Sequence, residues 1–437
     1  MTQKKAQNKN FLLGILNGTV FKLAISFYNP NTVLPLFISF FTSSKLLIGS
    51  IITITNFGFL APQLFVANLI GHWERKKSFY VLGAFFRITS WFAIFIITYI
   101  YALKNPLLVL ISFFFFYSIA CLGAGISQIS FLDIISKVVK PTNRGRFFSL
   151  RQFFGGILGI GGGIIVKYIL SDEKSFPFPL NFSFLFFLAF IFIFIALSLF
   201  ACVKEPPSSI KNNRRAPFIQ YLKNIPHILT KDKNYRLFLI TKLLLSSGII
   251  ALPFYIIYAR DVFRIPKEMA GIFISSQALG GIISTFFWGY LSDKYGNKIV
   301  VQLSGIIGLI VPLLTLISGI MISLFYSLSI SIIYYSLIFL FLGMNISGNY
   351  IGQTNLLLEI SPEESRATYI GIVNTLSALV MLLPLMGGII IEKTSYLTNF
   401  SLAFFLILGG LLLTFYLKEP RKNLTKEDKL LKFYRNE

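Results

Sequence analysis

The feature that most constrains this chain is a series of long apolar stretches that recurs from one end to the other. Each stretch is about 20 residues long, which lets a helix cross roughly 30 Å of hydrocarbon. A transmembrane β-strand would instead alternate in polarity over about 10 residues, whereas these stretches are apolar throughout. The pattern therefore predicts an all-α polytopic membrane protein and excludes a β-barrel.

We predict twelve spans, at residues 11–41, 46–70, 78–101, 106–132, 147–170, 182–203, 237–258, 268–291, 299–322, 327–352, 369–391 and 397–417. Hydrophobic residues make up 55% of the chain and charged residues only 13%, which a soluble protein of 437 residues would not tolerate. We expect the first span to be retained, because its apolar segment is too long for a signal peptide.

The net charge of +23 would suggest a nucleic-acid partner in a soluble protein. Here most of the 40 Lys and Arg residues fall in the loops on the side that carries the N-terminus. Cytoplasmic loops are the ones rich in Lys and Arg. The charge distribution therefore predicts a multi-pass protein of the cell (plasma or inner) membrane with both termini in the cytoplasm. Its expected partner is the lipid bilayer and not nucleic acid.

Internal repeats indicate a duplication. "TVLPLFISF" at 32–40 matches "IALPFYIIY" at 250–258, and "VKEPP" at 203–207 matches "LKEPR" at 417–421, with offsets of 214 to 218 residues. The chain therefore divides into a cytoplasmic N-terminus (1–10), two pseudosymmetric six-helix bundles (11–203 and 237–417), a cytoplasmic linker (204–236) and a basic cytoplasmic tail (418–437). Apolar residues at helical spacing in 218–229 predict an amphipathic linker helix that lies on the membrane surface, or alternatively binds a partner.

The decapeptide "GYLSDKYGNK" at 289–298 joins the eighth and ninth spans. Together with the twelve spans, the duplication and the basic linker, it resembles the signature loop of the major facilitator superfamily of secondary transporters, over residues 10 to 418. The resemblance implies two halves related by an axis along the membrane normal, a substrate site near the midplane and transport by alternating access. The matching loop of the first half, "ANLIGHWERK" at 67–76, departs from the motif, with Gly71 at the position of Asp293.

Charged residues at helix starts predict a cytoplasmic gate. Arg144 and Arg146 precede the fifth span, where the helix dipole disfavours positive charge unless an acid is near. By the pseudosymmetry of the halves, we expect Asp293 to supply that acid and the basic loop near 75 to face the acids that precede the eleventh span. The candidate gate residues are Gly289, Asp293, Lys294, Gly296, Lys298, Arg144, Arg146, Arg75, Lys76, Glu363 and Glu364. Alternatively, Asp293 only caps a tight loop.

Cations inside the spans predict a polar cavity. A charge at membrane depth is costly unless it faces a cavity or a partner. In this family the first, fourth, seventh and tenth spans line the cavity. The candidate cavity residues are Lys22, Asn29, Asn31, Arg87, Gln128, Arg151, Lys242, Asn345, Asn349 and Gln353. Alternatively, Lys22 binds carbonyls freed by Pro30, Arg87 serves helix packing, and Lys242 reaches the cytoplasmic interface.

Acidic residues occur only at the ends of spans, as at Asp133, Glu359 and Glu392. This disfavours proton symport through an embedded carboxylate. A cavity with cations and no acid suits a small anionic or strongly hydroxylated solute. A channel, a lipid scramblase or an efflux carrier for amphipathic drugs remains the alternative on the same scaffold.

Enzymatic motifs are not found in the sequence. The only histidines, His72 and His227, lie in cytoplasmic stretches, and no HExxH or GxSxG motif occurs. The absence of a P-loop predicts that the chain does not use ATP. Cys121 and Cys202 form neither a disulfide framework nor a metal site. We therefore expect a monomeric, non-enzymatic transporter of a small molecule, with no cofactor and no metal.

Overall fold

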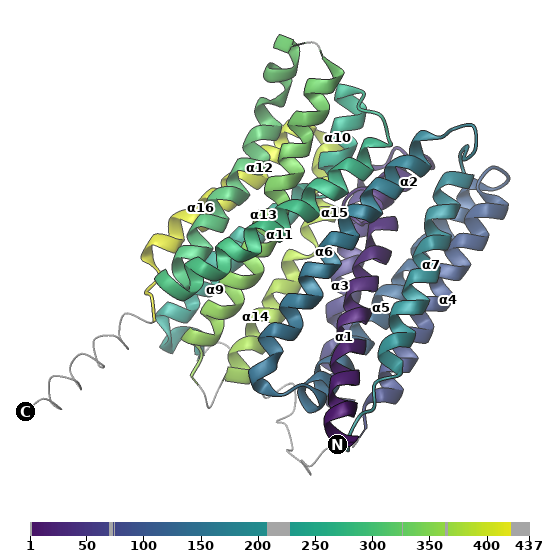
Figure 1. The fold of residues 1–437 in the computed structure, drawn as a ribbon. Coiled ribbons are helices and arrows are strands. Elements are labelled where there is room, and N and C mark those ends of the chain that lie inside the picture. Colours follow the sequence, from purple (N-terminus) through teal and green to yellow (C-terminus); the bar gives the residue numbers. More distant parts are fainter. Residues whose placement is uncertain are drawn as a thin grey trace, which may run out of the picture.

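The computed structural model (Figure 1) describes residues 2–69, 73, 75–207, 228–325, 327–362 and 366–420. Within these ranges, side chains are described except at 2–7, 64–69, 141–142, 144–145, 319, 321–325 and 366–368. The described residues contain twelve helical segments that are long and apolar enough to span a membrane. Helices satisfy every backbone polar group internally, which hydrocarbon requires. The predicted all-α polytopic membrane fold is confirmed.

The first half of the chain forms one bundle. Its helices are α1 (Thr2–Phe27), α2 (Val33–Ser39), α3 (Lys45–Leu69), α4 (Lys77–Tyr101), α5 (Pro106–Val138), α6 (Pro141–Ser171) and α7 (Leu180–Ala201). Helix α1 packs on α6 and α7, while α4 packs on α5 and α7. Phenylalanines and tryptophans fill the space between these helices, with Phe37, Trp91 and Phe186 almost fully buried.

The second half forms the other bundle. Its elements are α9 (Lys233–Ser246), the 3₁₀ helix η1 (Ser247–Ala251), α10 (Phe254–Phe263), α11 (Met269–Tyr295), α12 (Asn297–Phe325), α13 (Leu328–Ile360), α14 (Arg366–Val380), α15 (Leu383–Lys393) and α16 (Tyr396–Tyr416). Helices α11, α12 and α13 pack together, and α16 packs on α9 and α12. Figure 1 shows the two bundles side by side, the first in purple and blue and the second in green and yellow.

Three of the predicted spans are broken, including the first, where Pro30 predicted a break. The first span divides between α1 and α2 at 28–32, the seventh around η1, and the eleventh between α14 and α15 at 381–382. Proline stands at each break, because it cannot donate the backbone hydrogen bond that a continuous helix needs. At the first break the side chain of Asn29 accepts a hydrogen bond from the backbone N–H of Asn31 at 2.9 Å, which fixes the turn.

Several helices extend past their predicted spans, and α5 and α13 do so by the most at their C-terminal ends. The expected spans 106–132 and 327–352 continue to Val138 in α5 and to Ile360 in α13. In the structure Asp133 is paired with two lysines, so its charge does not end the helix. Of the predicted linker helix at 218–229, residues 218–227 lie outside the described residues, as does the tail from 421 onward.

The two bundles meet along α6–α11 and α3–α15, with a smaller contact between α2 and α10. We use "terminal end" for the end of the molecule where α1 begins and α16 ends, and "distal end" for the end where α2 leads into α3. Near the distal end the α6 and α11 backbones touch through Gly163 and Gly271, where any added Cβ would collide with the facing backbone. Such small residues let membrane helices approach closely.

Candidate functional site

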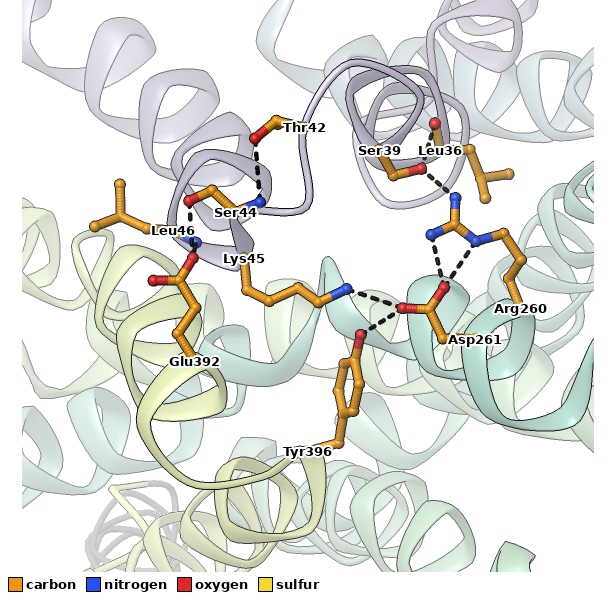
Figure 2. Close-up of polar contacts among 10 residues, drawn as sticks. All are labelled: Leu36, Ser39, Thr42, Ser44, Lys45, Leu46, Arg260, Asp261, Glu392 and Tyr396. Atoms are coloured by element: carbon orange, nitrogen blue, oxygen red, sulfur yellow. Dashed lines mark hydrogen bonds and ion pairs between the residues drawn. The ribbon is translucent and has the colours of Figure 1, made fainter.

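A polar network joins the two bundles at the distal end (Figure 2). The carboxylate of Asp261, in α10, accepts hydrogen bonds from the ammonium of Lys45 at 2.9 Å and from the hydroxyl of Tyr396 at 2.8 Å. It also pairs with Arg260 at 2.6 Å, and the Arg260 guanidinium donates to the hydroxyl of Ser39. Lys45 and Ser39 belong to the first bundle, so Asp261 and Arg260 bind across the interface.

A second carboxylate at the distal end caps a helix of the opposite bundle. Glu392, at the end of α15, accepts hydrogen bonds from the hydroxyl of Ser44 at 2.8 Å and from the backbone N–H of Leu46 at 3.0 Å. Leu46 lies in the first turn of α3, whose N–H groups have no partner within the helix and carry partial positive charge. Separating the bundles at this end would remove the cap.

The third cross-bundle contact is an ion pair between Lys267, just before α11, and Glu173, just after α6, at 2.7 Å. The Lys267 ammonium lowers the pKa of the Glu173 carboxyl. We call Lys45, Asp261, Arg260, Glu392, Glu173 and Lys267 the distal latch. The latch was not predicted from the sequence.

Toward the terminal end, α6 and α11 part. The ring contact between the two helices that lies nearest the terminal end is that of Phe153 in α6 with Phe286 in α11, whose centroids are 6.3 Å apart. On the terminal side of that contact, Phe148 of α6 and Tyr290 of α11 are exposed. Gly289, one of the candidate gate residues, lies in open space, because a Cβ added there would meet no atom within 4 Å. Among the described side chains, the interface between these helices is therefore tight at the distal end and open at the terminal end.

The gate residues predicted from the decapeptide do not meet their expected partners in this conformation. Asp293 is exposed, and no ion pair joins it to Arg146, which is also exposed and described. The ammonium of Lys294 hydrogen-bonds the hydroxyl of Tyr290, one turn earlier in its own helix. Arg75 is exposed. The side chain of Arg144, together with Gly71, Glu363 and Glu364, lies outside the described residues.

The rest of the decapeptide builds a tight turn within the second bundle. Gly296 joins α11 to α12 with φ of +91°, a backbone conformation that favours glycine. Asn297 donates to the carboxylate of Glu359 at 2.8 Å, which ties the turn to α13. The backbone N–H of Lys298 donates to Glu419 at 2.9 Å, and its ammonium donates to the carbonyl of Leu417 at 2.7 Å. The repeated "KEP" sequence therefore caps the start of α12.

The first bundle repeats this arrangement. Glu205 of the other "KEP" sequence accepts the backbone N–H groups of Lys76 and Lys77, both at 2.9 Å, and so caps α4. Lys76 pairs with Asp133 at 2.6 Å, and Lys137 bridges Asp133 and Glu205 at 2.7 Å. Lys76, expected in the gate, thus binds inside its own bundle. The "KEP" repeat was visible in the sequence, but nothing in it indicated a helix cap.

The cations predicted to line the cavity gather between helices of the first bundle. The Lys22 side chain of α1 lies against Gly155 of α6, and the Arg151 side chain of α6 lies against Gly18 of α1. The two cationic groups are close enough to repel each other. Arg151 also donates to the carbonyl of Gly14 at 3.3 Å. Glycines at these places give the two long side chains room to lie across the helix interface.

Arg87 of α4 also contacts α1. Its guanidinium carbon is 4.5 Å from the centre of the Phe21 ring, a cation–π contact. The buried Tyr80, two turns earlier in α4, lies in the electrostatic field of both Arg87 and Arg151. We call Lys22, Arg87, Arg151 and Tyr80 the cation cluster.

The cation cluster has no acidic counterpart. The ion pairs among the described residues do not include Lys22, Arg87 or Arg151. Lys22 is nevertheless exposed, in the middle of a membrane-spanning helix. An exposed ammonium at that depth is tolerated where it meets water or a ligand rather than lipid.

The second bundle contributes a polar chain of its own. Lys242 of α9 donates to Gln353 of α13 at 2.9 Å, and Gln353 donates to Asn349 at 3.0 Å. Asn345 instead donates to the carbonyl of Ser304 at 2.8 Å, which ties α13 to α12. Gln128 of α5 and Asn31 are half-buried, whereas Asn29 is buried in the break of the first span.

Two helical bundles with twelve candidate membrane spans define the class of a polytopic membrane protein. A family model described as Major Facilitator Superfamily matches residues 16–383 and again 237–433. The chain belongs to the major facilitator superfamily. No curated protein sequence matches it.

Solved transporter structures share this fold. The chain resembles the nucleoside transporter NupG with a TM-score of 0.68, 14% identity, and coverage of 94% of this chain and 98% of the other. It resembles a D-xylose–proton symporter with a TM-score of 0.65, 16% identity, and coverage of 95% and 98%. For a bacterial homologue of ferroportin, the TM-score is 0.64 in the inward-facing state and 0.59 in the outward-facing state, at 14% identity and coverage of 94% and 98% in both.

Proposed function

We propose that this protein is a secondary transporter that moves a small anionic or strongly hydroxylated organic solute across the membrane by alternating access. Membership of a transporter family supports the general activity. The observation that carries the choice of solute is the cation cluster, where Lys22, Arg87 and Arg151 have no acidic partner among the described residues. Uncompensated charge inside a protein is unfavourable until an opposite charge or hydrogen-bond acceptor fills the site.

The asymmetry of the bundle interface supports alternating access. The distal latch holds the bundles together at one end while α6 and α11 part at the other. The reverse state would need the latch to break and the terminal end to close. We propose that Asp293 then meets Arg144 and Arg146, and that Arg75 and Lys76 meet Glu363 and Glu364. Single exposed ion pairs contribute only about 0–1 kcal/mol each, enough to bias two states of similar free energy.

The proposed orientation has the terminal end in the cytoplasm. The bias of Lys and Arg toward that side supports it. In the conformation described here, the interface between the bundles would then be open toward the cytoplasm. The better match to the inward-facing than to the outward-facing state of the ferroportin homologue agrees with this orientation.

The solute class is tested by the thermal stability of the purified protein. We expect sugar phosphates, dicarboxylates or polyols to raise the melting temperature, and the Lys22→Gln variant to lose that increase. Lys167→Gln, which removes a cation from α6 outside the cluster, should keep it. The binding solute is then followed into proteoliposomes, with and without a pH gradient. Stabilisation by organic cations alone would overturn the proposed solute class.

The terminal gate is tested by cysteine accessibility. We expect Asp293→Asn to raise the labelling of a cysteine placed at Gln152, an exposed residue of α6, when labelled from the cytoplasmic side. Asp172→Asn, at the distal end, should leave labelling unchanged. Equal labelling of the parent protein, Asp293→Asn and Asp172→Asn would contradict the gating role of Asp293.

A further inference from the structure

We propose that a cavity on the lipid-facing side of the bundle interface binds an anionic phospholipid from the leaflet at the distal end, and that this lipid holds the two bundles together there. The cavity measures about 510 Å³ and is lined by Lys167 of α6 and by residues of α11 and α13. We call it the lateral cavity. Lipid binding stands independently of the proposed function, whereas the effect of the lipid on conformation rests on the proposed alternating access.

The side of α11 that lines the lateral cavity faces lipid. Helix α11 packs on both α6 and α13 (Figure 1). Ile272 and Ser276 line the cavity and lie on the same face of α11 as Leu279 and Ile283, because residues three or four positions apart share one face of a helix. Leu279 and Ile283 are exposed apolar residues of a membrane-spanning helix, so this face lies against acyl chains. The contact with α6 uses a different face of α11, at Gly271.

The distal part of the lateral cavity is positively charged. Lys167 is the only charged residue among those that line the cavity. It lies one turn before α6 ends at Ser171, which is about 5 Å along the helix. The ion pairs among the described residues do not include its ammonium. A lysine at this depth extends toward the lipid headgroups, where a phosphate is the anion that meets it.

The start of α13 adds a second attraction for a phosphate. Ser329, in the first turn of α13, also lines the lateral cavity. That turn contains no acidic residue, and the side chain of Ser327 at the N-cap makes no capping hydrogen bond. The first N–H groups of a helix carry partial positive charge and have no partner within the helix. Lys167 from the first bundle and the start of α13 from the second therefore both attract an anionic headgroup to this cavity.

Further from the distal end, the lateral cavity is mainly apolar. Ile333, Leu337 and Leu340 of α13 line it, and Leu340 lies three turns beyond Ser329, about 16 Å along the helix. A cation at headgroup depth above an apolar surface matches the two parts of an anionic phospholipid. A soluble anion would gain nothing from the apolar part. A zwitterionic lipid would bring its own cation close to Lys167.

The lateral cavity depends on the closed distal end. A Cβ added at Gly271 of α11 would collide with the backbone of Gly163 and Lys167 in α6, so the two helices touch beside the cavity. Opening the distal end would carry Lys167 away from α11 and α13, and one lipid would no longer contact both bundles. A ligand that binds one of two conformations better shifts the population toward it. The anionic lipid therefore acts together with the distal latch.

Native mass spectrometry of the purified protein tests the identity of the lipid. The protein is mixed with phosphatidylglycerol and phosphatidylcholine that have the same acyl chains, and the lipid that remains bound is counted. We expect the parent protein to retain phosphatidylglycerol about fivefold more than phosphatidylcholine, which is the contribution of one lysine beside an anionic headgroup. Lys167→Gln should retain the two lipids equally. Lys104→Gln removes an exposed lysine from the loop between α4 and α5 and should keep the preference.

A second variant tests the apolar part of the cavity. Leu337→Trp fills the space where the acyl chain is expected and should lose the bound phosphatidylglycerol. Leu412→Trp, at an exposed position of α16 outside the cavity, should retain it. Equal retention of both lipids by the parent protein, or an unchanged preference in Lys167→Gln, would overturn the site. Displacement of the lipid by glycerol 3-phosphate would indicate a site for a free anion and would overturn the lipid assignment.

A distance measurement tests the effect on conformation. Cys121 and Cys202 are replaced by serine, and spin labels are attached to cysteines at Lys174 and Thr394, exposed distal positions in opposite bundles. Phosphatidylglycerol in place of phosphatidylcholine in nanodiscs should shift the population toward the shorter distance in the parent protein and not in Lys167→Gln. Lipid binding without that shift would overturn the effect on conformation and leave the proposed function standing. Displacement of the lipid by the transported solute would place the cavity on the transport path and overturn the inference.

Discussion

Replacing Asp261 by asparagine should release the distal latch. Asp261 is the only carboxylate within ion-pair distance of Lys45 among the described residues, and Lys45 belongs to the opposite bundle. Asparagine keeps the volume and one acceptor for Tyr396 but loses the charge. Arg260 also loses the carboxylate that orients it toward Ser39. The substitution therefore weakens two contacts between the bundles and leaves the interior of each bundle unchanged.

The magnitude follows from the exposure of the pair. The side chains of Lys45 and Asp261 are 18% and 28% exposed, so the ion pair is partly buried and still reached by water. Exposed pairs contribute about 0.2–1 kcal/mol, and losing a partner from a fully buried pair costs about 3–5 kcal/mol. We expect about 1.4 kcal/mol for this partly shielded pair with its Arg260 contact. Because about 1.4 kcal/mol changes an equilibrium constant about tenfold, the ratio of distal-open to distal-closed molecules should rise about tenfold.

The measurement is the distance between spin labels at 174 and 394, in opposite bundles at the distal end. A double-mutant cycle with Lys45→Gln isolates the pair, and the two substitutions together should shift the ratio less than the sum of their separate effects. Asp172→Asn is the matched control, because the Asp172 carboxylate accepts hydrogen bonds from residues of its own loop, including the backbone N–H of Ser175. Strictly additive effects, or an equal shift in the control, would refute the latch.

Two further substitutions test the packing that the latch depends on. Glu205→Ala should lower the free energy of unfolding by about 2–3 kcal/mol, because it leaves two helix N–H groups without their acceptor and removes an ion-pair partner of Lys137. The melting temperature measures the loss of stability, and Glu205→Gln should recover part of that loss. Gly271→Ala should open the distal end, since an added methyl group collides with the backbone of α6 in the closed state at a cost of about 1–3 kcal/mol. Gly161→Ala, where an added Cβ meets no atom within 4 Å, should leave the label distances unchanged.

The fold class could be predicted because hydrocarbon leaves a chain few choices. A stretch of about 20 apolar residues must be a helix in a membrane, so the number of such stretches in the sequence gives the number of spans. The duplication made the two-bundle arrangement predictable as well. The breaks in three spans were less predictable. Proline marks a position where a helix can break, but kinked helices also contain proline, as α3 does at Pro62.

The cations of the candidate site were recognisable because charge at membrane depth is rare and costly. Lys22, Arg87 and Arg151 were identified individually from their positions in the spans. Which neighbours their side chains meet depends on how α1, α4 and α6 rotate about their axes. Rotation is set by side-chain packing, such as that of Arg151 against Gly18, which no local pattern records.

The sequence by itself determined the membrane setting, the helical content, the duplication and the kinds of charge available. The tertiary structure decided which charges meet. Asp293 and Lys45 both stand at the ends of spans, yet only Lys45 finds an opposite charge across the interface in this conformation. The physical reason is that polarity and span length act locally along the chain. Pairing depends instead on the relative tilt of two bundles, which contacts between residues some two hundred positions apart establish.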